Sequence, residues 1–370
     1  MQIEIYNMIP VGENISISLE AVCDSFSSLL WDIEYYKCGA FEVYIAASPR
    51  NIEIFQTGRI VGRDDDREHF GLIESVELET DAEDGDYLII KGRFLMCLLE
   101  RRIIYPTFNF TKLVSYSQII MNVVQYNACT SGFRKIPGLV VGCSSGTCWD
   151  AKTKLQVSYD NLMEWVYTIC EKISGTANIR LSKIDNEQYE MIFELLQGTD
   201  RSVLQEVNPH IIFSDRYNNL LSFTYFTDTS VKKNYAYVLG KGEGEKRKRT
   251  TYFEGTEPSS LERYEVYIDA KEISDEEQVD NETKPISETE YEELLKEKGK
   301  QSLVPITMKS ESQIAVQSTQ FQYGVDYFVG DFVTVEHHRF GIRQNKIQLI
   351  GMIESFDSNG RNLTPTFKED

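Results

Sequence analysis

Two short runs of this 370-residue sequence contain residue types that bind metals. Residues 64–66 are three consecutive aspartates, but the run lacks the glycine and the terminal glutamate of a calcium-binding loop. His337 and His338 follow Glu336, and adjacent residues on a strand point to opposite faces, so their imidazoles would not converge on one ion. We expect structural or solvent-exposed roles for both runs.

The cysteines predict reduced thiols. There are seven, an odd number without C-x-x-C spacing, which is typical of a protein from a reducing compartment. Cys143 and Cys148 lie closest together and could form a disulfide or take part in a metal site, although no His-x-x-x-His run accompanies them. A chance spacing in a loop is favoured, and whether the two pair stays open.

Two further runs could bind phosphate groups. Residues 240–244 read G-x-G-x-G, but a dinucleotide-binding loop needs G-x-G-x-x-G at the start of a helix, so a flexible connection between strands is favoured. The four cations at 246–249 could neutralise phosphates. They lack interleaved aromatic residues and lie in acidic sequence, which favours a solvated hairpin arm or a contact with an acidic protein.

No defensible active site emerges. The sequence contains no G-x-S-x-G or H-E-x-x-H motif, and carboxylates are so numerous that pairing any two as acid and base would be arbitrary. We therefore predict no catalytic, cofactor-binding or metal-binding residue and no cofactor.

Composition predicts a folded protein rich in β-structure. Hydrophobic residues make up 41% of the chain and aromatic residues 12%, which excludes global disorder and favours pleated surfaces. The formal charge of −20 argues against stable binding to free DNA or anionic membranes. Neither a secretory signal nor a run long enough for a membrane helix is visible, so we expect synthesis in the cytoplasm and no membrane anchor.

Periodicity predicts strands on both sides of a mixed segment. Alternation at 70–92 around an acidic turn predicts a hairpin, 52–55 reads as a strand, and 324–356 reads as a β-meander. Apolar stripes predict helices at 119–126 and 162–173, the second capped by Ser158, and a hairpin is expected at 178–195 around Asp185. Ser287 and Glu290 form a capping box, which predicts an exposed helix inside a charged insertion at 274–300 whose first part we expect to be mobile.

These patterns predict a β-rich α+β fold in which two β-rich regions, at 1–113 and 236–356, flank an inserted α+β module at 114–206. Returning strands are expected at 207–235, a charged helical insertion at 274–300 and a C-terminal tail at 357–370. No sequence repeat is strong enough to prove that the two β-rich regions are duplicates.

Three segments resemble a known family, in the order in which the family has them. Residues 86–104 resemble the first-barrel signature of phage and prophage tail hub proteins, the siphovirus tail-associated, Tal-like baseplate hub family. Residues 237–244 with 263–270 resemble its middle segment, and residues 325–335 resemble its C-terminal signature.

The resemblance implies a structural baseplate or tail-tip hub without catalysis, in which two small β-barrels flank the inserted module. The first barrel would be 1–113 completed by the strands at 207–235, and the second would be 236–356. Three copies would form a ring of six barrels that closes the distal end of the tail tube and is assembled into the virion tail or a tail-like particle. The implied partners are a distal tail or tail tube protein, the tape measure protein, and a separate tip, receptor-binding or lytic protein, because the sequence ends at Asp370 soon after the signature. DNA would only pass through the acidic lumen.

Two other classes of protein stay open on the residues alone. The acidic clusters could serve an enzyme that cleaves peptidoglycan or another polysaccharide. The 21 tyrosines could serve a carbohydrate-binding module as stacking platforms. A mass near three times 42.6 kDa in solution would favour the hub over either alternative.

Overall fold

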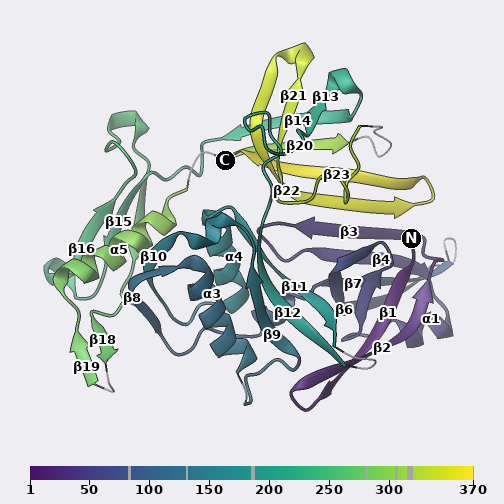
Figure 1. Ribbon diagram of the computed structural model, residues 1–370, viewed down its shortest axis with the longest axis horizontal. Helices are drawn as coiled ribbons and strands as arrows, with labels where there is room; N and C mark the ends of the chain where they lie inside the picture. Colours follow the sequence, from purple (N-terminus) through teal and green to yellow (C-terminus); the bar gives the residue numbers. More distant parts are fainter. Residues whose placement is uncertain are drawn as a thin grey trace.

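A single large sheet runs through the molecule and brings strands from both ends of the chain side by side (Figure 1). The computed structural model describes residues 1–81, 85–130, 132–184, 188–279, 282–304, 307–314 and 320–369. Among these residues the large sheet has 16 strands, with the main order β11-β12-β2-β1-β5-β6-β7-β4-β3-β22-β23-β20-β14. The fold is therefore β-rich α+β, as the sequence predicts.

The N-terminal half of the large sheet contains seven strands around one apolar core. They are β1 (Ile3–Val11), β2 (Asn14–Cys23), β3 (Ser28–Glu34), β4 (Ala40–Ala46), β5 (Ile60–Arg63), β6 (Asp66–Asp81) and β7 (Gly85–Phe94). The predicted hairpin at 70–92 is confirmed as β6 and β7. The predicted strand at 52–55 is wrong: α1 (Pro49–Ile54) occupies it, because the Ser48 side chain accepts a hydrogen bond from the Asn51 amide and Pro49 begins the helix.

A mixed module of helices and strands follows (Figure 1). Its elements are α2 (Cys97–Glu100), β8 (Phe108–Ser115), α3 (Tyr116–Val124), the π-helical turn Gln125–Cys129, β9 (Leu139–Ser144), the 3-10 turn Thr147–Asp150, β10 (Lys152–Val157), α4 (Leu162–Lys172), β11 (Gly175–Lys183) and β12 (Gln188–Gln197). The predicted apolar stripes form the buried faces of α3 and α4. Asn161, not Ser158, caps α4, since its side chain accepts from the amides of Met163 and Glu164. β11 and β12 confirm the predicted hairpin strands, whereas its turn at Asp185 lies outside the described residues.

The C-terminal half contains the strands after residue 207 that join the large sheet. They are β13 (Ile212–Ser214), the 3-10 turn Asp215–Tyr217, β14 (Leu220–Asp228), β20 (Thr307–Ile314), β21 (Phe332–His337), the 3-10 turn His338–Phe340, β22 (Ile342–Asp357) and β23 (Gly360–Glu369). β13 pairs with β21 and β14 with β20, so the strands at 207–235 complete this half and not the first barrel. The expected tail at 357–370 is largely β23, which pairs with β22 along its length.

A small satellite unit lies apart from the large sheet (Figure 1). It comprises β15 (Tyr235–Leu239), the 3-10 turns Gly244–Lys246 and Ser260–Glu262, β16 (Arg249–Tyr252), β17 (Glu265–Asp269), β18 (Glu276–Val279), β19 (Glu282–Pro285) and α5 (Glu288–Ser302). The predicted capping box is present at the start of α5, whose Tyr291, Leu294 and Leu295 pack on the β15 sheet. The stretch at 274–285 was expected to be mobile; β18 and β19 pair antiparallel within it, and residues 280–281 lie outside the described residues.

The expectation of two closed barrels is corrected by the strand pairing. A closed barrel requires the strands at the two edges of its sheet to pair with each other. Within the described residues, no such pairing occurs in either half. β3 uses its outer edge to pair with β22 of the other half instead. The two halves consequently share one open sheet, and each keeps a separate core.

The two halves nevertheless repeat one strand order. β3-β4-β7-β6-β5 in the first half corresponds to β14-β20-β23-β22-β21 in the second. β6 and β22 are both 16 residues long, and their hairpin partners β7 and β23 are both 10. The ladder is also interrupted at the same place, after Ile73 in β6 and after Leu349 in β22. The structure therefore contains an internal duplication.

Candidate functional site

The junction between the two halves is the part of the molecule with the most unusual chemistry. β3 and β22 pair antiparallel from Glu34 opposite Gly351 to Leu29 opposite Phe356. In Figure 1 these strands lie side by side at the centre of the large sheet. This ladder joins the two halves into one sheet.

A buried ion-pair cluster lies at the junction. Arg63, the last residue of β5, is only 2% exposed, and its Nη1 donates to Oε1 of Glu354 at 3.1 Å. Its Nε donates to Oδ1 of Asp65 at 2.8 Å. Arg361 of β23 also donates to Glu354, whose side chain is 3% exposed. Two cations thus hold one buried carboxylate.

Aromatic rings cover the guanidinium of Arg63. Its Cζ lies 5.5 Å from the ring centre of Trp31 and 4.8 Å from that of Phe356. Burial acts to lower the pKa of Arg63, but hydrogen bonds and charge from Asp65 and Glu354 outweigh it and raise that pKa. Arg63 therefore keeps its charge at neutral pH, and its ion pairs serve to fix the geometry of the junction.

A histidine-carboxylate pair extends the junction. Asp66 accepts from Trp31 Nε1 at 2.9 Å and lies 2.9 Å from Nδ1 of His69. Burial acts to raise the pKa of Asp66, but the charge and hydrogen bond of His69 lower it overall. Burial acts to lower the pKa of His69, but Asp66 raises it overall. The pair therefore favours the imidazolium.

This pair predicts a loss of stability as the pH rises above neutrality. The pKa of histidine in an unfolded chain is about 6.5, and the pKa of His69 in the folded chain is higher. The pair therefore stabilises the fold fully below about pH 6.5, and this stabilisation is lost as the pH rises through the folded pKa. We expect the free energy of urea unfolding to fall more between about pH 6 and 8.5 in the natural chain than in His69→Gln. Equal falls in the two proteins would contradict a stabilising pair.

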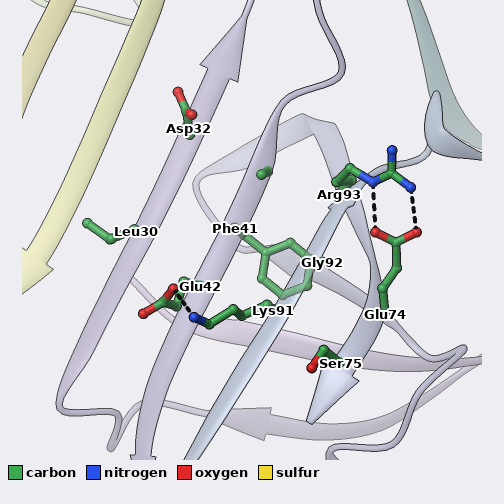
Figure 2. Close-up of a pocket in the computed structure, with 10 residues that line it drawn as sticks. Leu30, Asp32, Phe41, Glu42, Glu74, Ser75, Lys91, Gly92 and Arg93 are labelled. Atoms are coloured by element: carbon green, nitrogen blue, oxygen red, sulfur yellow. Dashed lines mark hydrogen bonds and ion pairs between the residues drawn. The ribbon is translucent and has the colours of Figure 1, made fainter. Parts of the chain in front are cut away.

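A shallow pocket of about 430 Å³ lies on the surface formed by β3, β4, β6 and β7 (Figure 2). Lys91 holds Glu42 at 3.1 Å, and Arg93 Nε holds Glu74 at 2.8 Å. Asp32 lies apart from both ion pairs in Figure 2, and burial raises its pKa although Lys37 opposes the shift. Two of the three carboxylates that line the pocket are therefore held in ion pairs with Lys91 and Arg93.

The three aspartates at 64–66 do not converge on an ion. Asp65 binds Arg63, Asp66 binds Trp31 and His69, and Asp64 accepts from the Gln2 amide. The described part of the chain holds no group of three histidine, cysteine, aspartate or glutamate residues placed to bind a metal.

The histidine pair and the basic run have intramolecular partners. His337 lies 3.5 Å from Asp215 and contacts Phe340, while His338 begins the next turn. In the run at 246–249, Arg247 pairs with Asp269 and Lys248 with Glu288. Much of the basic charge is therefore neutralised within the satellite unit.

The remaining sequence candidates are structural. Residues 240–244 connect β15 to a 3-10 turn, and Tyr291 of α5 packs against Gly240. All seven cysteines are free thiols, with Cys143 exposed and Cys148 partly buried, and burial raises the pKa of Cys148 to about 11. Among the described residues no helix is long and apolar enough to cross a membrane.

Sequence reasoning missed the junction cluster because its members are remote in the chain. Arg63 and Glu354 are 291 residues apart, and neither lies in a recognisable motif. The one available signal was the position of Glu354, two residues after Met352, where strand alternation turns a side chain inward.

The fold is similar to those of three tail proteins of known structure. It is similar to the tail protein from Neisseria meningitidis MC58, with a TM-score of 0.56 and 13% identity over 100% of this chain and 96% of that chain. It is also similar to the prophage tail protein gp18 from Listeria monocytogenes EGD-e, with a TM-score of 0.52 and 10% identity over 100% and 95% of the two chains. The 43 kDa tail protein of prophage MuSo2 from Shewanella oneidensis gives 0.52 and 14% over 98% of each chain.

The sequence itself identifies the family. Residues 3–367 match the family described as Siphovirus ReqiPepy6 Gp37-like protein, so the chain belongs to that family. No curated protein matches the sequence. The predicted recognition as a phage or prophage tail protein is confirmed.

Proposed function

We propose that this tail protein is a hub, three copies of which form a ring that closes the distal end of the tail tube. The observation that carries this proposal is the internal duplication, because each chain supplies two similar sheet units joined edge to edge through β3 and β22. Three such chains would supply six similar units and match a sixfold tube.

The chemistry of the chain supports a structural role. The most buried charged side chains, Arg63 and Glu354, form an ion pair that joins the two halves. The formal charge of −20 suits a wall along which DNA travels without binding, since like charges repel. The hub therefore acts as a stiff ring without catalysis.

The partners follow from this position in the tail. The ring contacts the distal tail or tail tube protein on one side, the tape measure protein in the lumen, and a separate tip, receptor-binding or lytic protein on the other. The protein is made in the bacterial cytoplasm and incorporated into the virion tail or a tail-like particle. The satellite unit with its insertion at 274–300 lies outside the large sheet and is placed for a peripheral contact. The division into a first β-rich unit at 1–113 and an inserted module at 114–206 stays part of this proposal.

Light scattering tests the ring in solution. We expect a mass near three times 42.6 kDa, for the chain alone or after addition of the distal tail protein. A strict monomer under both conditions, even at high concentration, would contradict the proposal. Turnover of cell-wall substrate that disappears when one carboxylate is replaced would contradict the non-catalytic role.

A further inference from the structure

The internal duplication relates individual positions of the two halves. Ile73 of β6 corresponds to Leu349 of β22, and Asp81 to Asp357, at one constant sequence offset. Just before β5 and β21, Gly58 and Gly330 both have a positive φ, of 87° and 102°. Their amides donate to the carbonyls of Ile73 and Leu349 at 2.8 and 2.7 Å.

The same correspondence extends to the outer strands. β4 pairs with β7 as β20 pairs with β23, so that Ala40 opposite Arg93 corresponds to Lys309 opposite Lys368. One strand further out, Trp31 opposite Phe41 in β3 corresponds to Tyr225 opposite Ser310 in β14. β14 is therefore the counterpart of β3.

β3 has a neighbouring strand on both edges, whereas among the described strands β14 has a neighbour, β20, on one edge. β3 pairs with the second part of β22, beyond the point where β21 ends. No strand in the described part of the chain pairs with the outer edge of β14. The second part of β6, the counterpart of that part of β22, is likewise bordered by β7 alone after Ile73. Long unpaired edges are ready templates for another strand.

We infer that β14 of one copy pairs with the second part of β6 in the next copy, reproducing between chains the ladder that β3 and β22 form within one chain. The inference rests on the proposed ring. Within one chain, Trp31 lies opposite Glu354. Because Tyr225 corresponds to Trp31 and Leu78 corresponds to Glu354, the same register places Tyr225 opposite Leu78 of the next copy. Transferring Leu30 opposite Ser355 places Thr224 opposite Glu79.

Exposure agrees with this register. Tyr225 is 43% and Leu78 is 53% exposed in the single chain, whereas Trp31 in the corresponding place is fully buried. An aromatic ring and a leucine directly opposite each other stabilise an antiparallel pair, and the pairing would cover both. At this position the ladder between chains would be apolar, through Tyr225 and Leu78, whereas the ladder within the chain has the ion pair of Glu354.

Charge selects this pairing over self-pairing. The second part of β6 carries Glu77, Glu79 and Asp81, so pairing two copies of β6 would bring acidic side chains together. The paired stretch of β14, residues 223–228, has one charged residue, Asp228, which this register places at the end of the ladder opposite Ser75, so the stretch can accept this acidic strand. Joining β14 to β6 is a head-to-tail contact, which repeats around a ring until it closes.

Engineered cysteines test the register. Thr224→Cys combined with Glu79→Cys places thiols at opposed exposed positions, within the Cα separation that a disulfide tolerates. Mild oxidation should link chains to each other, up to a covalent trimer on a non-reducing gel. Leu30→Cys with Ser355→Cys, the corresponding pair at the seam within the chain, should link only within one chain. Thr224→Cys with Glu77→Cys, out of register by two residues, should link chains about tenfold less.

The outcomes separate this inference from the ring itself. The natural chain, oxidised in parallel, corrects for links through exposed Cys143. Light scattering could show a trimer in which Thr224→Cys and Glu79→Cys form no disulfide, although the Leu30–Ser355 control does. That result would overturn this interface but not the proposed ring. A monomer that forms no links between chains would overturn both.

A single substitution gives an independent readout. Leu78→Glu should weaken association about tenfold or more, because it places a charge in the apolar seam. Leu261→Glu is the matched control, since Leu261 is exposed in the satellite unit away from the seam, and it should leave association unchanged. Equal effects of the two changes would contradict the inference.

Discussion

Replacing Arg63 by alanine should lower the free energy of unfolding by about 3 kcal/mol or more. Removing one partner of a buried ion pair leaves the other charge without compensation, which typically costs about 3–5 kcal/mol. Arg361 remains beside Glu354 and offsets part of this loss, so the lower end of that range is expected. Loss of packing between Trp31 and Phe356 adds to it. Equilibrium unfolding in urea measures the change.

Arg67→Ala is the matched control for this prediction. Arg67 also pairs with a carboxylate, that of Glu4, but its side chain is 56% exposed. Exposed pairs contribute about 0–1 kcal/mol, so the control should lose little stability. If both variants lost the same small amount, the junction cluster would not be what holds the halves together.

Replacing Gly92 by alanine should cost about 3 kcal/mol, near the upper end of what overpacking a core usually costs. An ideal Cβ at this position would lie 1.9 Å from the carbonyl oxygen of Leu72 and 2.7 Å from the ring of Phe41. The oxygen belongs to the paired strand β6, so the β6–β7 ladder must separate to make room. Thermal or urea unfolding measures the loss.

Gly351→Ala in β22 separates this steric effect from the general effect of removing a strand glycine. The Cβ added there would meet its nearest neighbours at 3.6 Å, an ordinary contact distance. Its free energy of unfolding should stay within about 1 kcal/mol of that of the natural chain, because fewer unfolded conformations compensate small adjustments. Similar losses at Gly92 and Gly351 would contradict the proposed clash.

The local elements were predictable because their signals are local. Alternation around an acidic turn predicts β6 and β7, apolar stripes predict α3 and α4, and the Ser287–Glu290 capping box predicts the start of α5. The prediction of a strand at 52–55 was wrong because it relied on the β-branched residues there. Ser48 followed by Pro49 is the stronger signal, and it marks the start of a helix.

The junction and the missing barrel closure were not predictable in the same way. Both depend on β3 choosing β22 as its neighbour, a pairing between distant segments that no local pattern specifies. The absence of any predicted catalytic residue stays a prediction, since a structure alone does not test it.

The duplication was hidden because the halves conserve register and not residues. Phe41 in β4 lies opposite Gly92 in β7, whereas the corresponding pair in the second half is Ser310 opposite Phe367. The aromatic residue has moved to the neighbouring strand. Leu78 and Glu354 likewise occupy corresponding places with opposite polarity, so alignment of the residues alone shows little similarity.

The most direct test of the proposed hub is a three-dimensional reconstruction of the assembled tail by electron cryomicroscopy. The account predicts three copies of this chain in one ring at the distal end of the tube, each presenting two sheet units around the lumen. Density for the chain along the tube wall, at the capsid end, or as isolated copies on the outside of the tail would contradict it.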